Sequence, residues 1–346
     1  MVEAFLPVKA GGLGIRRVSS LALPAFLASA ASTLALQSFM LSNVISDIDT
    51  QLAASFEHWC LKYPTCRPDG ELPHKQSFWD KPIITETISE LNHLHTSEYH
   101  QARLKAVSAP HAGDWLFALP ISACGLRLDD EAVRIAVGLR LGTVICHPHD
   151  CPCGTLVTAE GSHGLSCRLG PGRYARHAVL NDLICRGLIQ AGIPAVKEPP
   201  GLPRSDCKRP DGLTLIPWRS GRCLTWDVTV ADTVAPSYLA TTCNRMGGAA
   251  ELAEARKDSK YTQLMQSYHF VPLAFETMGP INAKGQTFLA DLGRLLGQIS
   301  GDPRETSFLF QRLSVVIQRF NAIAFHGTFV LPDLDKDGHS RVNIAY

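Results

Sequence analysis

Two aspartates near the middle of the chain, Asp211 and Asp227, are spaced so that they can meet across a β-hairpin. Apolar and polar residues alternate over residues 224–231, with Asp227 among the polar ones, and this alternation predicts a half-buried strand. A shorter alternation before it and the turn-forming run Arg219-Ser220-Gly221 predict the other half of the hairpin. If the hairpin folds about Arg219, the two aspartates are cross-strand neighbours with Cβ atoms about 5 Å apart.

Two carboxylates held this close destabilise a sheet unless a cation lies between them. A hard divalent ion, magnesium or manganese, prefers oxygen ligands of this kind and binds substrate phosphate as well. We therefore predict Asp211 and Asp227 as magnesium ligands and as the catalytic carboxylates of an enzyme that acts on phosphate esters. A slip of one residue in the register would separate the pair. The alternative interpretation is a pair of solvated aspartates on an edge strand.

A lysine lies on the apolar side of the helix that is predicted over residues 249–265. Lys257 falls in the middle of the apolar stripe, and Lys260 lies one turn further on, near its edge. An inward-facing lysine is costly unless it meets an anion, and two aspartates with a bound phosphate would supply one. We predict Lys257, with Lys260 as the second candidate, as a catalytic residue. The alternative is a lysine whose charged end reaches solvent. The stripe consists of Ala250, Ala253, Tyr261 and Leu264.

A short segment rich in glycine, cysteine and histidine predicts a zinc site. Zinc takes four cysteine or histidine ligands in a tetrahedron, and two ligand pairs separated by a loop provide that geometry. Four protein ligands leave no open position, which favours a structural over a catalytic site; free thiols in a loop are the alternative. The predicted ligands are Cys151, Cys153, His163 and Cys167, with Cys146 as an alternative to Cys151.

Overall composition limits the classes of protein that the chain can represent. The eleven cysteines are odd in number and irregularly spaced, which favours reduced thiols in an intracellular protein over a disulfide scaffold. The net charge is +1, so any contact with nucleic acid must come from local clusters of basic residues. The alternative for such a cluster is a solvated surface. The predicted nucleic-acid contacts are Arg173, Arg176, His177, Lys208 and Arg209.

The two aspartates resemble the signature of the PD-(D/E)xK restriction-like endonucleases. Residues 209–211, Arg-Pro-Asp, match its first half, whereas in the second half Thr229 stands where the signature has a lysine. Some members of that superfamily take the lysine from the adjacent helix, and the run Lys257-x-x-Lys260-Tyr261 resembles that arrangement.

The order of these segments resembles the C-terminal part of site-specific non-long-terminal-repeat retrotransposon proteins. The order is a zinc knuckle, an Arg-His helix, the Arg-Pro-Asp segment, a Trp-Asp-Val-Thr strand and the two-lysine helix. Residues 6–16 resemble the segment that follows the reverse transcriptase core of those proteins. The chain has no polymerase palm motif, so reverse transcription by this chain alone is not expected.

This resemblance implies a magnesium-dependent endonuclease that nicks target DNA and leaves a 3′ hydroxyl for priming the copying of an element's RNA. Target DNA is the first partner that it implies, element RNA is the second, and the nucleus is the implied location. The alternative function is a catalytically inactive, nucleic-acid-binding zinc protein, and Thr229 is its best support.

The predicted fold class is α+β, with a helix, strands, a helix and a strand in order within the restriction-endonuclease-like core. Glu198 and Glu276, near the ends of predicted strands, are further candidates for metal ligands. The uncharged stretch 21–41 contains Pro24 and several serines, so we expect a buried core helix and no membrane association. The predicted regions are helices over 1–110, a zinc-binding module at 111–172, the core at 173–280, C-terminal helices at 281–330 and a flexible tail at 331–346.

Overall fold

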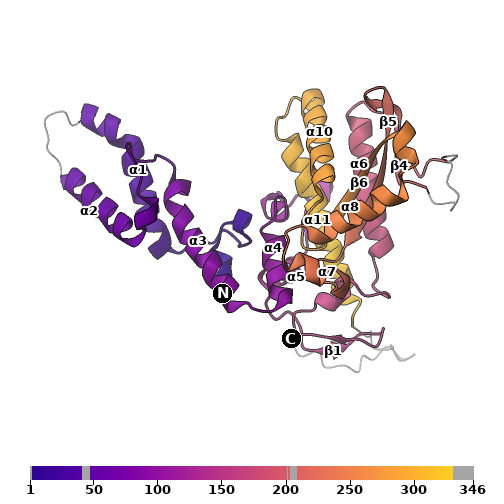
Figure 1. Cartoon of the computed structure of the whole chain (residues 1–346), viewed down its shortest axis with the longest axis horizontal. Coiled ribbons are helices and arrows are strands. Elements are labelled where there is room, and N and C mark those ends of the chain that lie inside the picture. Colours follow the sequence, from indigo (N-terminus) through magenta and orange to yellow (C-terminus); the bar gives the residue numbers. More distant parts are fainter. Residues whose placement is uncertain (1, 41–46, 201, 203–208, 330–346) are drawn as a thin grey trace. The chain divides into compact units, whose positions relative to one another are not determined.

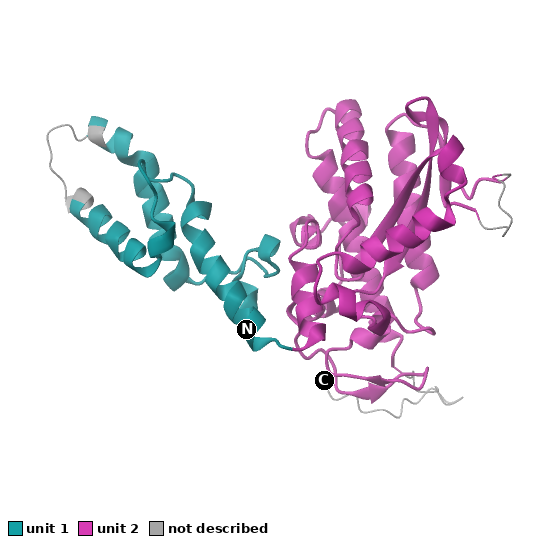
Figure 2. Cartoon of the chain, viewed as in Figure 1, with its two compact units in different colours: residues 1–96 teal, residues 97–346 magenta. Residues whose placement is uncertain are grey.

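The computed structural model describes residues 2–40, 47–200, 202 and 209–329. The chain forms two compact units, residues 1–96 and residues 97–346 (Figure 2). The division falls after Thr96 and not after residue 110, because α4 (Glu98–Val107) packs on α7 (Pro236–Thr242) within the second unit. The tail that was predicted over residues 331–346 lies outside the described residues.

The first unit is a group of helices around an aromatic core. Trp59 and Trp79 are fully buried, and their ring centroids lie 4.9 Å apart with nearly perpendicular planes. Trp79 Nε1 donates to Pro73 O (2.8 Å). Large aromatic rings dominate the energetics of a core, so this pair fixes how two of the helices meet. The elements are α1 (Val18–Met40), α2 (Asp47–Lys62) and α3 (Gln76–Leu94), with 3-10 turns at Glu3–Phe5, Val8–Ala10 and Pro64–Cys66 (Figure 1).

α1 buries only part of its surface. Leu27 and Ala31 are buried, whereas Val18 and Phe39 are exposed. The stretch Val18–Gln37 is long and apolar enough to cross a membrane by length and composition, and 28% of it is buried. The burial that we expected of a core helix is therefore found for part of this helix only.

The second unit is built on a four-stranded mixed sheet with the strand order β3-β4-β5-β6. β3 (Ala195–Lys197), β4 (Gly212–Arg219) and β5 (Arg222–Ala231) are antiparallel neighbours, and β6 (His269–Glu276) runs parallel to β5. α6 (Arg173–Gln190) precedes these strands. The crossover from β5 to β6 contains α7, α8 (Gly248–Lys260) and α9 (Leu264–Ser267) (Figure 1). The structure thus has the predicted order of helix, strands, helix and strand, and the α+β class is confirmed.

Side chains of β5 alternate between the two faces of the sheet. Leu224, Trp226 and Val228 enter the main core, where they pack with residues of α6, α10 (Ala283–Ser300) and α11 (Glu305–His326). Asp227 belongs to the opposite face, which α8 covers. The alternation therefore directs Asp227 toward α8 and away from the main core.

A cysteine-rich segment lies between α5 (Asp130–Leu141) and α6. It contains the short antiparallel strands β1 (His149–Asp150) and β2 (Leu156–Val157) and a 3-10 turn at Ser162–Leu165. Gly164 of this turn lies against the backbone of α11 at Ala324, where a Cβ atom would come within 2.8 Å of the carbonyl oxygen. The segment therefore packs on the last turns of α11. Further 3-10 turns lie at Asp114–Phe117 and Ser122–Cys124.

Candidate functional site

The base of the β4–β5 hairpin has a register that brings the two aspartates together. Gly212 pairs with Trp226, and continuing this pairing by one residue places Asp211 opposite Asp227. A Cβ atom on Gly212 would lie 1.9 Å from Cζ2 of Trp226, so the indole ring rests directly on the glycine backbone. A glycine at this position is therefore what allows the buried ring and the strand that begins at Gly212 to pack together.

The turn of the hairpin falls within the predicted run Arg219-Ser220-Gly221, but it is not centred on Arg219. The pairing shifts along the strands until Arg219 meets Arg222. The turn is made by Ser220 and Gly221, both in the left-handed conformation with φ of 50° and 72°. Irregular pairing near the turn moves the centre of the tip to between Ser220 and Gly221, while the base keeps the register of a hairpin centred on Arg219.

Asp211 is held both by α6 and by β5. Its Oδ2 accepts hydrogen bonds from His177 Nε2 (2.9 Å) and from Val228 N (2.5 Å). Its backbone N donates to Trp226 O (2.9 Å), and its backbone O accepts from Asn181 Nδ2 (3.1 Å) and from Glu198 N (3.0 Å). The hydrogen bond to Asp211 raises the pKa of His177. Within the described residues, every hydrogen bond to the carboxylate falls on Oδ2, which leaves Oδ1 available to a cation.

Asp227 is almost fully buried, and both of its carboxylate oxygens have a donor. Lys257 Nζ donates to Oδ1 and the Tyr261 hydroxyl donates to Oδ2. Lys260 Nζ donates to the same hydroxyl (3.0 Å), so Lys260 is linked to Asp227 through Tyr261. A buried carboxylate is tolerated only when such donors offset its desolvation. The lysine that the helical pattern directs inward therefore meets the aspartate on the facing strand.

α8 is shorter than the predicted helix. It ends at Lys260, and a turn separates it from α9. Tyr261 caps this end by donating its backbone N to Lys257 O (2.9 Å), and its hydroxyl also lies 2.9 Å from Arg209 O. The early end allows Tyr261 to reach both the aspartate and the segment that precedes β4.

The five residues predicted to contact nucleic acid have different surroundings. Arg173 and Arg209 are exposed, and His177 is half-buried against Asp211. Arg176 is buried, with Nη1 donating to Asn321 Oδ1 (3.4 Å), and its prediction as a phosphate contact is wrong because its guanidinium lies inside the unit. Lys208 lies outside the described residues.

The two glutamates predicted as further metal ligands differ in their distance from the aspartates. Glu198 is exposed in a left-handed backbone conformation (φ 48°), and its backbone N donates to Asp211 O (3.0 Å). Glu276 is fully buried at the end of β6, where Oε1 accepts from Ala250 N (3.0 Å) at the start of α8. Among the described residues, neither forms a group of three or more ligand side chains with Asp211 and Asp227.

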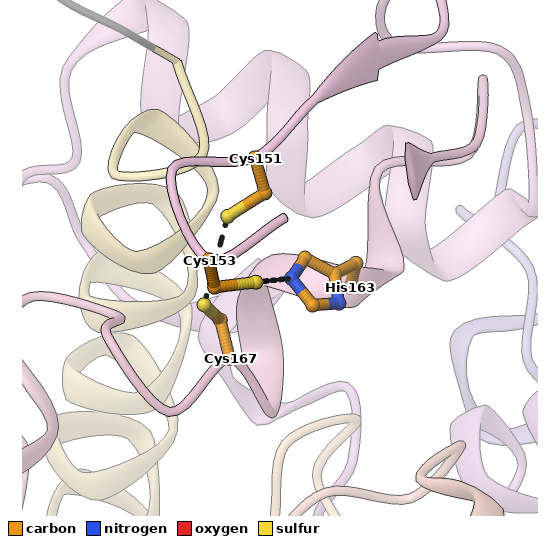
Figure 3. A group of neighbouring side chains, drawn as sticks. All are labelled: Cys151, Cys153, His163 and Cys167. Atoms are coloured by element: carbon orange, nitrogen blue, oxygen red, sulfur yellow. Dashed lines mark hydrogen bonds between the residues drawn. The ribbon is translucent and has the colours of Figure 1, made fainter. Parts of the chain in front are cut away.

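The cysteine-rich segment brings its four predicted ligands together (Figure 3). Their ligand atoms all lie within 4.8 Å of one another; the sulfurs of Cys151 and Cys167 are 3.6 Å apart, and the sulfur of Cys153 is 3.2 Å from His163 Nε2. Ligands about 2.3 Å from a tetrahedral zinc ion are separated by roughly 3.8 Å, so this cluster could bind a metal such as zinc. Cys146 packs beside the cluster, but its sulfur contacts Thr158 O (3.4 Å). Of the two alternatives, Cys151 and not Cys146 therefore belongs to the cluster.

The thiols of the cluster differ in acidity. Burial raises the pKa of Cys151 to about 11, whereas the neighbouring Thr155 hydroxyl lowers the pKa of Cys153 to about 6. Only a thiolate binds metal, and a bound cation favours the thiolate of every ligand. Cys153 is therefore ready to bind at neutral pH, and the buried Cys151 must lose its proton when metal binds.

Sequence reasoning missed two residues at the hairpin. Asn181 of α6 contacts both Asp211 and Trp226, and Tyr261 contacts Asp227, although the helical pattern assigned Tyr261 only to an apolar stripe. The spacing of Asn181 four residues after His177 puts both on one face of α6. That spacing is the one sequence signal for Asn181, and it does not show which residues Asn181 contacts.

The chain matches no protein-family model, and no curated protein matches it either.

Proposed function

We propose that the chain is a metal-dependent DNA endonuclease whose active site lies at the base of the β4–β5 hairpin. One observation carries the proposal: Lys257 reaches from α8 to Asp227, which the hairpin register sets opposite Asp211. Two acidic side chains and a lysine at one place are the groups that phosphodiester hydrolysis requires. The PD-(D/E)xK resemblance and the order of α6, β3–β5, α8 and β6 support the same function.

Asp211 and Asp227 are the residues that would hold magnesium or manganese. The donor set fits a hard cation, because both ligands are carboxylates and no described residue hydrogen-bonds Asp211 Oδ1. When bound, the ion supplies positive charge that polarises the phosphate and makes a water molecule more nucleophilic.

The side chains of this protein contribute charge and orientation. Lys257 is 23% exposed and lies between Asp227 and solvent, so its ammonium group can orient a water molecule or offset charge that develops on the phosphate. Lys260 is linked to the same carboxylate through Tyr261 and is the second candidate for this role. Arg173 and Arg209, both exposed, would neutralise phosphates of the target strand.

The cysteine-rich cluster is proposed as a structural zinc site. Cys151, Cys153, His163 and Cys167 would hold the ion with no open position, which suits a structural role. The segment around them has few apolar residues, so metal binding would provide much of its stability. By the resemblance to retrotransposon proteins, the nick would leave a 3′ hydroxyl that primes copying of element RNA in the nucleus.

A second function is favoured by a separate observation. Both oxygens of Asp227 are already bound by donors from α8 and its end, and Thr229 stands where the restriction-like signature has a lysine. Such a site resembles one in which internal contacts have replaced the metal. The corresponding protein would bind nucleic acid and zinc without cutting DNA.

Nicking of supercoiled plasmid separates the two functions. The zinc-loaded chain should convert plasmid to the open circle with magnesium and not with EDTA, and Asp227→Asn should abolish this conversion. Asp258→Asn is the matched control, because Asp258 also lies on the α8 side of the sheet and is also paired with a lysine, Lys284. If wild type and both variants bind DNA but none cuts it, the second function is the correct one.

A further inference from the structure

We propose that His177 and Asn181, one turn apart on α6, are positioning residues that fix Asp211 for metal binding. We call this pair the α6 clamp. The inference rests on the proposed function, since it assigns a role toward the metal that Asp211 would hold. Neither residue belongs to the predicted catalytic set: His177 was expected to contact nucleic acid, and Asn181 was not singled out.

The backbone of Asp211 is held by the chain on either side of it and by one side chain of α6. It precedes β4, so regular strand pairing begins only at Gly212. The peptide of Asp211 is fixed on both sides, because its N donates to Trp226 O (2.9 Å) and its O accepts from Glu198 N (3.0 Å) and from Asn181 Nδ2 (3.1 Å). Of these three contacts, the one from Asn181 is the only one made by a side chain.

Asn181 is buried, and both ends of its amide are used. Oδ1 accepts from Trp226 Nε1 (2.8 Å), and Nδ2 donates to Asp211 O. A rotated amide would set its NH2 group against the indole N–H and its oxygen against the carbonyl, so only one orientation satisfies both partners. Leaving a buried donor or acceptor unpaired costs about 1–3 kcal/mol. Asn181 therefore ties the Asp211 backbone to the most deeply buried ring of the hairpin.

His177 fixes the carboxylate rather than the backbone. Its Nε2 lies 2.9 Å from Asp211 Oδ2 and 3.1 Å from Val228 O, so this nitrogen bridges the aspartate to β5. Val228 N donates to the same Oδ2. Two donors on one oxygen orient the carboxylate, and no hydrogen bond from the described residues falls on the other oxygen, which we assign to the metal. Groups that orient metal ligands in this way typically change metal affinity about 10–100-fold when they are removed.

The test measures Mn²⁺ binding to the full-length, zinc-loaded chain by the loss of the free-ion paramagnetic signal. We expect one Mn²⁺ site that Asp211→Asn removes. His177→Ala should raise the dissociation constant for Mn²⁺ about 10-fold, while His177→Gln, whose side-chain N–H can reach the same oxygen, should restore most of the affinity. The half-exposed position of His177 makes both variants compatible with folding, and the unfolding midpoint of each is measured in parallel.

A second variant tests the backbone half of the clamp. Asn181→Asp keeps the acceptor for Trp226 but loses the donor to Asp211, and should weaken Mn²⁺ binding as well. Asn244→Asp is the matched control, because Asn244 is exposed and donates only locally, to Ala240 O and to the sulfur of Cys243. If Asn181→Asp fails to fold, the His177 pair carries the test alone.

The outcomes separate the clamp from the nuclease proposal. Unchanged Mn²⁺ affinity in His177→Ala, or equal losses in His177→Ala and His177→Gln, would overturn the clamp even if the wild type nicks DNA. Mn²⁺ binding that depends on Asp211 and His177 in a chain that never nicks DNA would support the clamp and overturn the nuclease. Mn²⁺ binding that Asp211→Asn leaves intact would overturn both.

Discussion

At the scale of single residues, the buried carboxylate of Asp227 is the most demanding group in the hairpin. Its two oxygens accept from Lys257 and from Tyr261, so its desolvation is offset by one charged and one neutral donor. A buried carboxylate that loses such a partner remains charged and uncompensated, or takes up a proton. The same lysine is thus both a structural partner of Asp227 and the group that we propose to act on the phosphate.

Lys257→Met should abolish nicking and also destabilise the fold. We expect a loss on the order of 2–3 kcal/mol, below the range for a fully buried pair because Lys257 is partly exposed. The double variant Asp227→Asn/Lys257→Met should recover part of this loss, and urea unfolding of all four proteins gives the coupling free energy. A coupling free energy of zero would show that the pair does not interact in solution.

Glu276 makes the stability depend on pH. Burial raises its pKa, and burial raises the pKa of nearby Asp232 too. When the pKa of a carboxyl group is higher in the folded than in the unfolded protein, the group favours folding most at a pH below its unfolded-state pKa. This contribution to the free energy of unfolding is lost as the pH rises through the folded-state pKa. Glu276→Gln carries no charge, so its melting temperature should exceed that of wild type at pH 8 by about 2–4 °C and match it at pH 4. A gain of equal size at both pH values would refute the electrostatic explanation.

Lys257 could be predicted from the sequence because it is a charged residue in the middle of an apolar stripe. The pattern of a single helix is enough to show this. Asn181 could not, since a polar residue on a helix carries no sign of its partner until the strands are placed. Arg176 was misassigned for a related reason: a surface arginine and one buried against Asn321 look the same in a sequence.

At the scale of elements, the β4–β5 hairpin is the part on which the site depends. Its base is fixed by Trp226, whose ring packs on Gly212 and whose N–H donates to Asn181. The alternating pattern of β5 sets which face carries Asp227, and the close approach of ring and glycine sets the register. The alternation is visible in the sequence, but the irregular pairing near Ser220 depends on local backbone geometry and could not be predicted.

Gly212→Ala should disturb this base directly. Its methyl group would overlap the indole ring of Trp226, and overpacking of this kind costs about 1–3 kcal/mol. Gly221→Ala, in the hairpin turn, is a comparison in which the added methyl meets no neighbouring atom, although the left-handed backbone adds strain. Urea unfolding should show the larger loss for Gly212→Ala if ring contact is the dominant effect, and Mn²⁺ affinity should fall only in that variant.

At the scale of the whole molecule, the second unit joins the cysteine-rich segment, the mixed sheet and the C-terminal helices. The 3-10 turn that carries His163 packs on the end of α11, and α11 also packs on α6. The three regions that composition distinguished between residues 111 and 330 therefore form one compact unit with α4. Composition separates local chemistry, but it cannot reveal packing between segments that are far apart in the sequence.

Removal of zinc should destabilise this unit. A ligand present at a thousand times its dissociation constant stabilises the folded state by about 4 kcal/mol, and Cys151 and Cys167 form the buried centre of their own small cluster with Val157. If the cluster holds zinc as proposed, treatment with a strong chelator, or Cys167→Ser, should release one zinc per chain and lower the melting temperature. Cys124→Ser is the matched control, because Cys124 is exposed and outside the cluster. A melting temperature unchanged after loss of the metal would contradict a structural role.

The most direct test of the central claim is the rate at which Asp211→Asn nicks supercoiled plasmid in magnesium, compared with the wild-type rate. Asp211 is the residue whose position follows from the register of the hairpin, and asparagine preserves its shape while removing its charge. We predict a wild-type activity that requires magnesium and a fall of about 100-fold or more in the variant. Equal rates for the two proteins would contradict the assignment of the active site to the carboxylates of this hairpin.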